Sequence, residues 1–440
     1  MPQLLLSYYG DDLTGSTDVM EALASRGVPT VLFMHEPTAA QRAKFPEARA
    51  IGLAGASRSE TPAWMDEHLT PALAWLKSLQ ASFCHYKVCS TFDSSPQIGS
   101  IGRAIDIGQA AFGQSRVPLV VGAPQLKRYT AFGNLFAAYQ GETYRIDRHP
   151  VMARHPVTPM READLRLHLA RQTTKTVGLV DLAALAQPDV DQRTDAVFAG
   201  AAEIVMFDVA DLATQAAVGR QLMRKADGGA FVVGSSGVEY ALLHEWTRAG
   251  LAVERMEFSA PGPVERIAVV SGSCSPTTSR QIRYAESRGF TAVPVEARRL
   301  ATGEGDAARE AIEKGLGRLA EGKSVVLYTA LGPETDLGKE LEGEHARRLI
   351  GETLGRIQRA FVERAGLRRV VIAGGDTSSH ALPQLGVYAL TTRLPLPSTP
   401  GSPLCLAHSD HQAFDGVEIA LKGGQVGNDD YFVRILRGAA

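Results

Sequence analysis

Cysteine is scarce in this 440-residue chain, which has only Cys84, Cys89, Cys274 and Cys405 and no Cys-X-X-Cys pair. Four scattered cysteines exclude a disulfide framework, and the missing pair argues against a structural zinc site. No stretch approaches the ~18 uninterrupted apolar residues of a membrane-spanning helix. The first residues lack a basic segment, so we expect no secretory signal and a cytoplasmic protein.

An excess of charge of either sign is also missing. The 46 Lys and Arg residues nearly balance the 48 Asp and Glu residues, and the net charge is −2. This balance argues against nucleic-acid binding through bulk electrostatics, although a small anionic substrate needs only a local basic site. His149, His155 and His380 show no paired spacing, so we expect no metal site built from histidine. An apolar fraction of 45% and a charged fraction of 21% are typical of globular proteins.

Short apolar runs alternate along the chain with helix-period segments, which predicts α/β architecture with mostly parallel sheets. The expected strands are 3–9, 30–34, 50–54, 83–90, 117–121, 176–180, 204–207, 230–233, 267–271, 291–295, 324–329 and 369–373. The clearest expected helices are 18–26, 62–79, 276–288, 306–320 and a long one ending near 366. A Pro- and Gly-rich segment at 257–264 interrupts the pattern. We therefore predict two domains, 1–258 and 259–440, each a mostly parallel sheet flanked by helices.

The segment Gly317–Ser324 matches the spacing of a phosphate-binding P-loop. A genuine P-loop follows a strand and opens a helix. Here a helix is expected before the segment and a strand after it. We therefore interpret the match as a helix end and look elsewhere for a nucleotide site.

Asp11 and Asp12 directly follow the first expected strand, where open α/β sheets bind their ligands. Two adjacent carboxylates repel each other unless a ligand or cation satisfies them. A solvated pair that caps the next helix is the alternative. The sequence favours a functional pair, since the loop after a central strand is usually crowded.

A second polar cluster runs from Lys87 to Gly102. Lys87 lies within an apolar strand pattern, so its ammonium should meet an acid or a bound anion. Asp93, Ser94 and Ser95 leave the strand end, and Ser95 could cap a helix opened by Pro96. After another strand, Arg58 is placed to fork onto a carboxylate, unless it is an ordinary surface arginine.

In the second half, two loops that leave strands and enter helices are rich in small and hydroxyl residues: Ser271–Thr278 and Gly374–Ser378. Such loops let backbone amides and the helix N-terminus approach phosphate. A third glycine turn, Lys422–Gly427, would also allow its backbone to approach a base or phosphates. Together they predict one nucleotide bound among Ser273, Ser275, Gly374, Gly375, Gly423, Gly424 and Gln425. No GxGxxG motif follows a strand with an acidic residue ~20 positions later, which argues against a dinucleotide-dependent dehydrogenase.

These segments, with Asp18, His149 and Pro150, resemble the four-carbon acid sugar kinase family, and they occur in order along both halves of the chain. The run Cys-Ser-Thr-Phe-Asp-Ser-Ser at 89–95 looks closest to the 3-oxo-tetronate kinase branch. Gly99-Ser100-Ile101-Gly102 stands where that branch has Gly-Asn-Ile-Gly, and the 422–427 turn and the Tyr8-Tyr9-Gly10 lead-in also differ. The substrate expectation is 3-oxo-tetronate, with 3-oxo-isoapionate, threonate and erythronate as alternatives.

The resemblance implies a sugar-acid domain, an ATP-binding domain and an active site in the cleft between them. ATP with Mg²⁺ would phosphorylate the terminal hydroxyl of the acid. Arg58 would hold the carboxylate, while Asp11, Lys87, Ser94 and Ser95 would contact the remaining groups. Asp12 or Asp93 would be the general base, with a slight preference for Asp12. A non-catalytic sugar-acid sensor is the alternative from another class, and a homodimer is possible.

Overall fold

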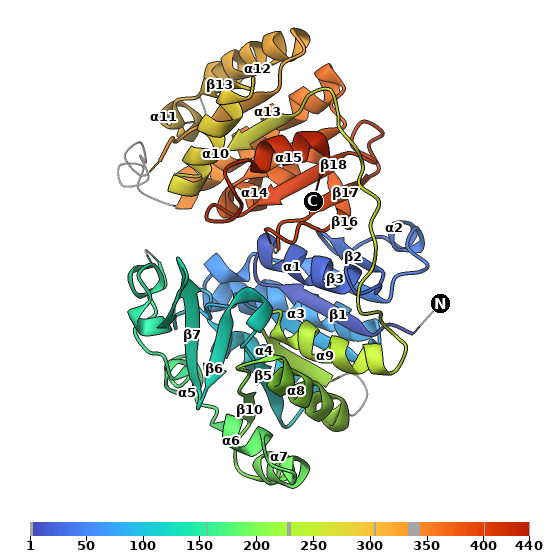
Figure 1. Cartoon of the computed structure of the whole chain (residues 1–440), viewed down its shortest axis with the longest axis vertical. Helices are drawn as coiled ribbons and strands as arrows, with labels where there is room; N and C mark the ends of the chain where they lie inside the picture. The colour runs from blue at the N-terminus through green and yellow to red at the C-terminus, as the bar shows by residue number, and fades with distance from the viewer. Residues whose placement is uncertain are drawn as a thin grey trace. The chain divides into compact units, whose positions relative to one another are not determined.

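The computed structural model describes residues 3–155, 157–226, 230–302, 305–332, 344–399 and 401–439. The chain forms two compact units (Figure 1), described here separately. The first unit comprises Met1–Val31 and Glu36–Met256, and the second comprises Leu32–His35 and Glu257–Ala440. The chain thus changes unit at the start of the Pro- and Gly-rich segment. The contiguous division predicted from the sequence does not include the short excursion at Leu32–His35.

The elements of the first unit alternate as the sequence pattern predicts. Its strands, including the short antiparallel ones, are β1 (Leu6–Gly10), β2 (Thr30–Phe33, which crosses into the second unit), β3 (Ala50–Ala54), β4 (Phe83–Lys87), β5 (Val117–Val120), β6 (Arg128–Ala131), β7 (Asn134–Tyr139), β8 (Glu142–Arg145), β9 (Val177–Val180), β10 (Ile204–Phe207) and β11 (Ala230–Gly234). Its helices are α1 (Leu13–Ala24), α2 (Ala39–Ala43), α3 (Pro62–Ser78), α4 (Ile101–Phe112), α5 (Leu165–Leu169), α6 (Leu182–Leu185), α7 (Val190–Ala199), α8 (Leu212–Lys225) and α9 (Gly237–Arg248), with 3-10 turns η1 (Ser57–Ser59), η2 (Pro124–Leu126), η3 (Ile146–Arg148) and η4 (Met152–Arg154).

A parallel sheet in the order β3-β1-β4-β11-β5-β10-β9 forms the centre of the first unit. In the sheet, β3 lies on one side of β1 and β4 lies on the other side. The chain therefore moves in one direction across the sheet from β1 to β3 and in the opposite direction from β3 to β4. Right-handed crossovers therefore put α1 and α3 on opposite faces of the sheet. The carboxyl ends of β3, β1 and β4 lie side by side, so the three polar loops that follow them meet at one edge.

Local capping explains most helix boundaries in this unit. Thr61 caps α3 and Pro62 lies in its first turn, so this helix begins at the residue that the sequence predicts. The start expected for the first helix, residue 18, is wrong, because Asp12 caps α1 and the helix starts at Leu13. A helix capped by Ser95 is also wrong: α4 begins at Ile101, and the Ser100 hydroxyl accepts the Arg103 N–H. The antiparallel sheet β6-β7-β8 is not predicted by the sequence pattern.

The second unit repeats the strand and helix alternation. Its strands are β12 (Ala268–Ser271), β13 (Thr291–Pro294), β14 (Val325–Tyr328), β15 (Arg369–Ala373), β16 (Val387–Leu394), β17 (Leu404–Ser409) and β18 (Glu418–Lys422). Its helices are α10 (Pro276–Ser287), α11 (Ala297–Ala301), α12 (Gly305–Ala320), α13 (Glu344–Ala365), α14 (Gly375–Ala381) and α15 (Tyr431–Arg437), with the 3-10 turn η7 (Leu382–Leu385).

The sheet of the second unit has a parallel part and an antiparallel part. β13, β14, β12, β15 and β18 are parallel, while β17 and β16 continue the sheet in alternating directions and β16 pairs with Leu32 and Phe33. The adjacent order β12-β15-β18 places the three predicted nucleotide loops at neighbouring carboxyl ends. The rejected P-loop match spans the last residues of α12 and the turn before β14, so a helix precedes it and a strand follows it, as expected.

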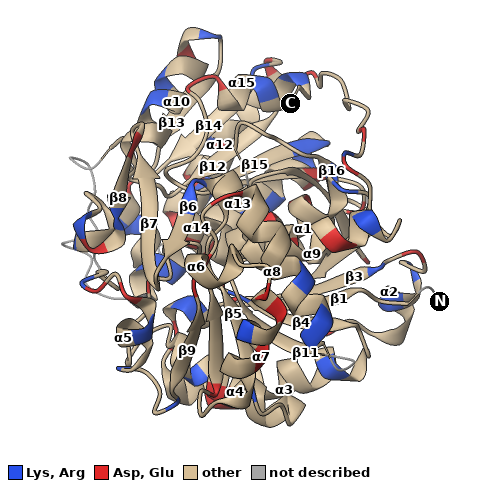
Figure 2. Cartoon of the chain, turned by 60° about the horizontal axis from the view of Figure 1, so that its bottom comes forward, with Lys and Arg blue, Asp and Glu red and all other residues tan. Residues whose placement is uncertain are grey.

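Charged residues of both signs are interspersed along the elements of each unit (Figure 2). The α/β architecture with parallel sheets flanked by helices is the one that the sequence pattern predicts. No helix within the described ranges has the length and apolar character needed to cross a membrane.

Candidate active site

Asp12 links helix α1 to the polar groups at the sheet edge. Its Oδ1 accepts the N–H of Gly15 as the helix cap, and its Oδ2 accepts Nη1 of Arg58 at 2.7 Å. The capping role therefore uses only one of its two oxygens. The side chain keeps 24% of its surface exposed, so the carboxylate remains within reach of a ligand.

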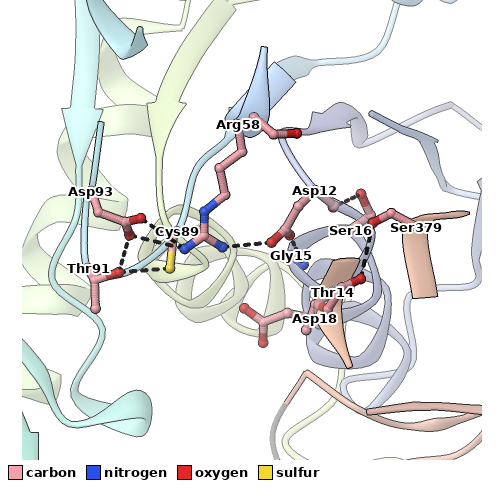
Figure 3. A network of polar contacts seen from close by, with 12 residues as sticks. Asp12, Thr14, Gly15, Ser16, Asp18, Arg58, Cys89, Thr91, Asp93 and Ser379 are labelled. Atoms are coloured by element: carbon pink, nitrogen blue, oxygen red, sulfur yellow. Dashed lines mark hydrogen bonds and ion pairs between the residues drawn. The ribbon is translucent and has the colours of Figure 1, made fainter. Parts of the chain in front are cut away.

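Arg58 bridges two carboxylates of the protein (Figure 3). Nη1 binds Asp12, while Nη2 binds Oδ1 and Oδ2 of Asp93 at 3.2 and 3.0 Å. The loop holds Arg58 closely, since its N–H donates to the carbonyl of Asp11 and a Cβ on Gly99 would lie 2.3 Å from its carbonyl oxygen. Arg58 thus forks onto carboxylates as expected, but those carboxylates belong to the protein.

Asp93 is the most fully satisfied acid of the cluster. Besides Arg58, its carboxylate accepts the hydroxyls of Thr91 at 2.5 Å and Thr158 at 3.1 Å, and only 4% of the residue is exposed. Burial alone would raise the pKa, but the charge of Arg58 and the hydrogen bond from Thr91 lower the pKa of Asp93 to about 2. Asp93 is therefore ionised and bound on both oxygens.

Asp11 lies beside this network with one oxygen unused. The residue is 4% exposed, and its buried Oδ1 has no hydrogen-bond partner among the described residues. Burial, reinforced by the negative charge of Asp12, raises the pKa of Asp11 to about 7. An unpaired buried oxygen is costly, which points to a group that binds there during function.

Three charged atoms surround the position that a side chain on Gly15 would fill. A Cβ there would lie 2.7 Å from Oδ1 of Asp12, 3.1 Å from Nζ of Lys87 and 3.5 Å from Oδ1 of Asp11. Lys87, at the end of β4, is 2% exposed and forms an ion pair with Asp18 at 3.7 Å. Burial works to lower the pKa of Lys87, but the charges of Asp18 and Asp11 prevail and raise it. Because Gly15 has no side chain, these three groups can approach its Cα closely, and we call Asp11, Asp12 and Lys87 the Gly15 cluster.

Ser94 and Ser95 both have contacts within the protein. Ser94 Oγ donates to the carbonyl of Phe92 and accepts from Gln172 Nε2 at 2.9 Å, and it also forms a hydrogen bond with His168 Nε2 at 2.9 Å. Ser95 Oγ donates to the carbonyl of Ile98 and accepts the N–H groups of residues 97 and 98. Their expected role in substrate binding stays a prediction, because the contacts they show stabilise the loop itself.

Arg128, at the start of β6, was missed by the sequence analysis. Its Nη1 donates to the carbonyls of Leu126 and Lys127 at 3.0 and 3.1 Å, but its buried Nε has no partner within the described ranges. Burial lowers the pKa of Arg128, and its backbone pairs with that of Ala123 in the loop that follows β5. The cation has no carboxylate partner in the described residues. The short strand β6 that carries Arg128 has no apolar periodicity, so the sequence pattern does not single out this residue.

In the second unit, the structure brings the predicted loops after β12, β15 and β18 together. Gly374 has φ +121°, and a Cβ on it would lie 3.6 Å from Cβ of Ser273. A Cβ on Gly424 would lie 2.9 Å from Oγ of Ser273 and 3.5 Å from Cβ of Ser275. Ser275 caps α10, while Gly375 opens α14 with free space around its missing side chain. Small residues thus let three loops converge next to a helix N-terminus, which is the backbone arrangement that suits phosphate.

The remaining predicted residues, Gly423 and Gln425, lie in the turn after β18. The carbonyl of Gly423 accepts Nζ of Lys422 at 2.7 Å, and Gln425 is exposed. Within the described part of the chain, no group of three or more His, Cys, Asp or Glu residues is arranged to hold a metal ion.

Comparison with known proteins matches each half of the chain to a family model. The sugar-binding N-terminal domain matches residues 6–242, and the nucleotide-binding C-terminal domain matches residues 268–432. The chain is 45% identical to the 3-oxo-isoapionate kinase of Paraburkholderia graminis, over 99% of this chain and 94% of that protein. It is 30% identical to a 3-oxo-tetronate kinase of Methylobacterium radiotolerans, over 98% of this chain and 99% of the relative.

Solved structures agree on the fold. A Salmonella typhimurium LT2 protein superposes with a TM-score of 0.80 at 23% identity, covering all of both chains. The Haemophilus influenzae protein HI1011 gives 0.71 at 21% identity, covering 97% of this chain and 98% of that one. The two matched family models and the 45% identity to a sugar acid kinase show that the chain is a carbohydrate kinase that belongs to the four-carbon acid sugar kinase family.

Proposed function

We propose that the protein transfers the γ-phosphoryl group of ATP to the terminal hydroxyl of a short oxo sugar acid. The first substrate to test is 3-oxo-isoapionate, followed by 3-oxo-tetronate. The observation that carries this order is the 45% identity to a 3-oxo-isoapionate kinase, against 30% and 27% for two of the 3-oxo-tetronate kinases. The sequence motifs alone favour 3-oxo-tetronate, and the whole-chain identity reverses that order.

Arg128 is our candidate for holding the substrate carboxylate. The sequence analysis gave this role to Arg58, whose guanidinium binds Asp12 and Asp93. Arg128 instead offers a buried Nε without a partner in the described ranges. An arginine binds a carboxylate through two N–H groups, and Nε with one Nη is a suitable pair.

The Gly15 cluster supports binding of the hydroxyl and oxo groups of the acid. Asp11 presents an unpaired oxygen that can accept a substrate hydroxyl, and Lys87 presents donors. Both side chains are buried, so each contact with a substrate group is made in a site from which water is largely excluded.

Asp12 is the better candidate for the general base. A base must be ionised and must reach the hydroxyl that it deprotonates. The oxygens of Asp93 already accept from Arg58, Thr91 and Thr158, and its side chain is only 1% exposed. Asp12 keeps unused lone pairs and a partly exposed carboxylate. Arg58, itself held by Asp93, then acts as a positioning residue that orients Asp12 directly.

ATP is assigned to the loops after β12, β15 and β18, where Ser273, Gly374 and Gly424 converge. Mg²⁺ bound with ATP is typically held by one or two carboxylates and by phosphate oxygens, so the absence of a larger acidic group from the described residues is compatible with it. Asp376, exposed in the first turn of α14, has no ion pair within the described ranges, and its carboxylate is a suitable ligand for Mg²⁺. When bound, the metal neutralises charge on the β- and γ-phosphates. The site between the domains, the homodimer and the cytoplasmic location stay predictions.

A coupled ADP-release screen tests the proposal. The purified wild-type protein is assayed with ATP, Mg²⁺ and each of 3-oxo-isoapionate, 3-oxo-tetronate, D- and L-threonate and D-erythronate. We expect the highest kcat/KM with 3-oxo-isoapionate. Higher turnover on 3-oxo-tetronate would reverse the order of substrates, and no stimulation by any acid would refute the proposed function.

A further inference from the structure

Lys422, the last residue of β18, is completely buried inside a cage of oxygen atoms. Its Nζ donates to the carbonyls of Gly423 at 2.7 Å, Gly424 at 3.3 Å and Val426 at 3.4 Å. It also donates to Oγ1 of Thr278 on α10 at 3.1 Å. One ammonium thus ties the turn after β18 to the helix that follows β12.

The cage fixes the orientation of the peptide groups in the turn. In a trans peptide the carbonyl and the following N–H point in opposite directions. Because the carbonyls of Gly423 and Gly424 face the ammonium, the N–H groups of Gly424 and Gln425 face away from it. Neither N–H donates to an oxygen of the described residues. Successive N–H groups that point to one side form an anion-binding nest.

This nest lies beside groups already assigned to phosphate. A Cβ on Gly424 would lie 2.9 Å from Oγ of Ser273, and the same Oγ accepts from Thr278 Oγ1 at 3.1 Å. Thr278 therefore connects the ammonium to the Ser273 loop.

The charge of Lys422 lacks a counter-ion within the described part of the chain, since its four contacts are to neutral oxygens. Burial accordingly lowers the pKa of Lys422 to about 7. A nearby anion would offset this desolvation.

We propose that Lys422 is a positioning residue whose caged ammonium aligns the Gly424 and Gln425 N–H groups into a nest for a nucleotide phosphate. The phosphate is the anion that balances the buried charge. This inference rests on the proposed assignment of ATP to the second unit. In this arrangement the carbonyl groups of the turn face Lys422, and the N–H groups on the opposite side face the phosphate. Lys422 therefore does not touch the nucleotide itself.

The test compares Lys422→Met, which keeps the length of the side chain, with Lys314→Met, which removes an exposed lysine from α12 of the same unit. ATP binding is measured by calorimetry without sugar acid, and amide hydrogen exchange follows residues 423–427. We expect ATP to protect the Gly424 and Gln425 amides in the wild type. We expect Lys422→Met to weaken ATP binding by about tenfold or more and to lose this protection, while Lys314→Met changes neither.

Chemical rescue distinguishes positioning from a general loss of structure. In Lys422→Ala, n-propylammonium should restore part of the ATP affinity, because it supplies both the charge and the N–H donors. Tetramethylammonium, which has no N–H donor, should not. The KM for sugar acid in residual turnover should stay within about twofold, since that site lies in the first unit.

If Lys422→Met folds too poorly to measure, Thr278→Val removes one contact of the cage and should also weaken ATP binding. Unchanged ATP affinity in a folded Lys422→Met variant, or ATP binding without protection of the two amides, would overturn the inference. If the wild type itself binds no ATP, the nucleotide assignment fails instead, so the two failures are distinguishable.

Discussion

Replacing Asp11 by Asn should make the first unit more stable at neutral and alkaline pH. The folded protein holds the pKa of Asp11 at about 7, above its ordinary value of 3.8, chiefly through burial. The folded state thus keeps a proton that the unfolded state releases between these two values. The stability contributed by this proton is fully present below pH ~4 and is lost as the pH rises through ~7. Asn has nearly the same shape and carries no charge at any pH.

The expected magnitude follows from the difference of about three pKa units. At ~1.4 kcal/mol per unit, burying the ionised carboxylate costs up to about 4 kcal/mol at pH 8. Asp11→Asn removes this cost and should raise the unfolding temperature of the first unit by up to about 10 °C. The gain should shrink steadily towards pH 4. Sugar-acid turnover should fall, because the neutral amide of Asn is a weaker acceptor than a carboxylate and can present its NH2 group to the substrate hydroxyl.

Tryptophan fluorescence is a suitable assay, since all three tryptophans, Trp64, Trp75 and Trp246, lie in the first unit. Denaturant unfolding is followed at several pH values from 4.5 to 8.5, together with Glu67→Gln as a control. Glu67 is exposed on α3 and forms no ion pair with a described residue, so its variant should parallel the wild type. If Asp11→Asn also parallels the wild type across this range, Asp11 is not held protonated by the fold and the reasoning is wrong.

Four further variants test the substrate site. Asp12→Asn should lower kcat by about a thousandfold with little change in sugar-acid binding, and a kcat equal to that of the wild type would exclude Asp12 as the base. Asp93→Asn should mainly weaken sugar-acid binding and lower the stability of the protein, because it releases Arg58. Arg128→Met should raise the KM for the acid by about a hundredfold and leave the KM for ATP unchanged. Steady-state kinetics with each substrate varied in turn measure both values, and a raised KM for ATP with an unchanged KM for the acid would contradict the assignment. Gly15→Ala should raise the KM for the acid by about tenfold, because its Cβ would lie 2.7 Å from Oδ1 of Asp12 and 3.1 Å from Nζ of Lys87 and would displace them. Calorimetry that shows wild-type affinity would exclude the Gly15 cluster as a binding site.

Much of the fold could be predicted because the apolar periodicity of a segment and the residues that begin or end it indicate the same element. The limits of β3, β10 and β15 match the expected strands, and Thr61 with Pro62 marks the start of α3. The β6-β7-β8 sheet was missed because its strands are short and half-exposed, without a continuous apolar run.

The candidate site was predictable in its location but not in its connections. Residues after neighbouring parallel strands must meet, so the clustering of Asp12, Arg58 and Asp93 follows from topology. The sequence could not show that Arg58 is engaged by both acids or that Asp11 is left with an unpaired oxygen. Arg128 was invisible for a different reason: its importance depends on an Nε without a partner, which is a property of three-dimensional packing.

The early excursion of Leu32–His35 into the second unit affects how the protein is made. Leu32 and Phe33 pair with Leu390 and Ala389, so a ribosome releases one side of this strand pair more than 350 residues before the other. The second unit cannot complete its sheet from the C-terminal half of the chain alone. A fragment that starts at Glu257 would expose the edge of β16 and should associate or aggregate through it. Adding a peptide that contains Leu32–His35 should suppress this association, which makes the two halves of the gene product interdependent during folding.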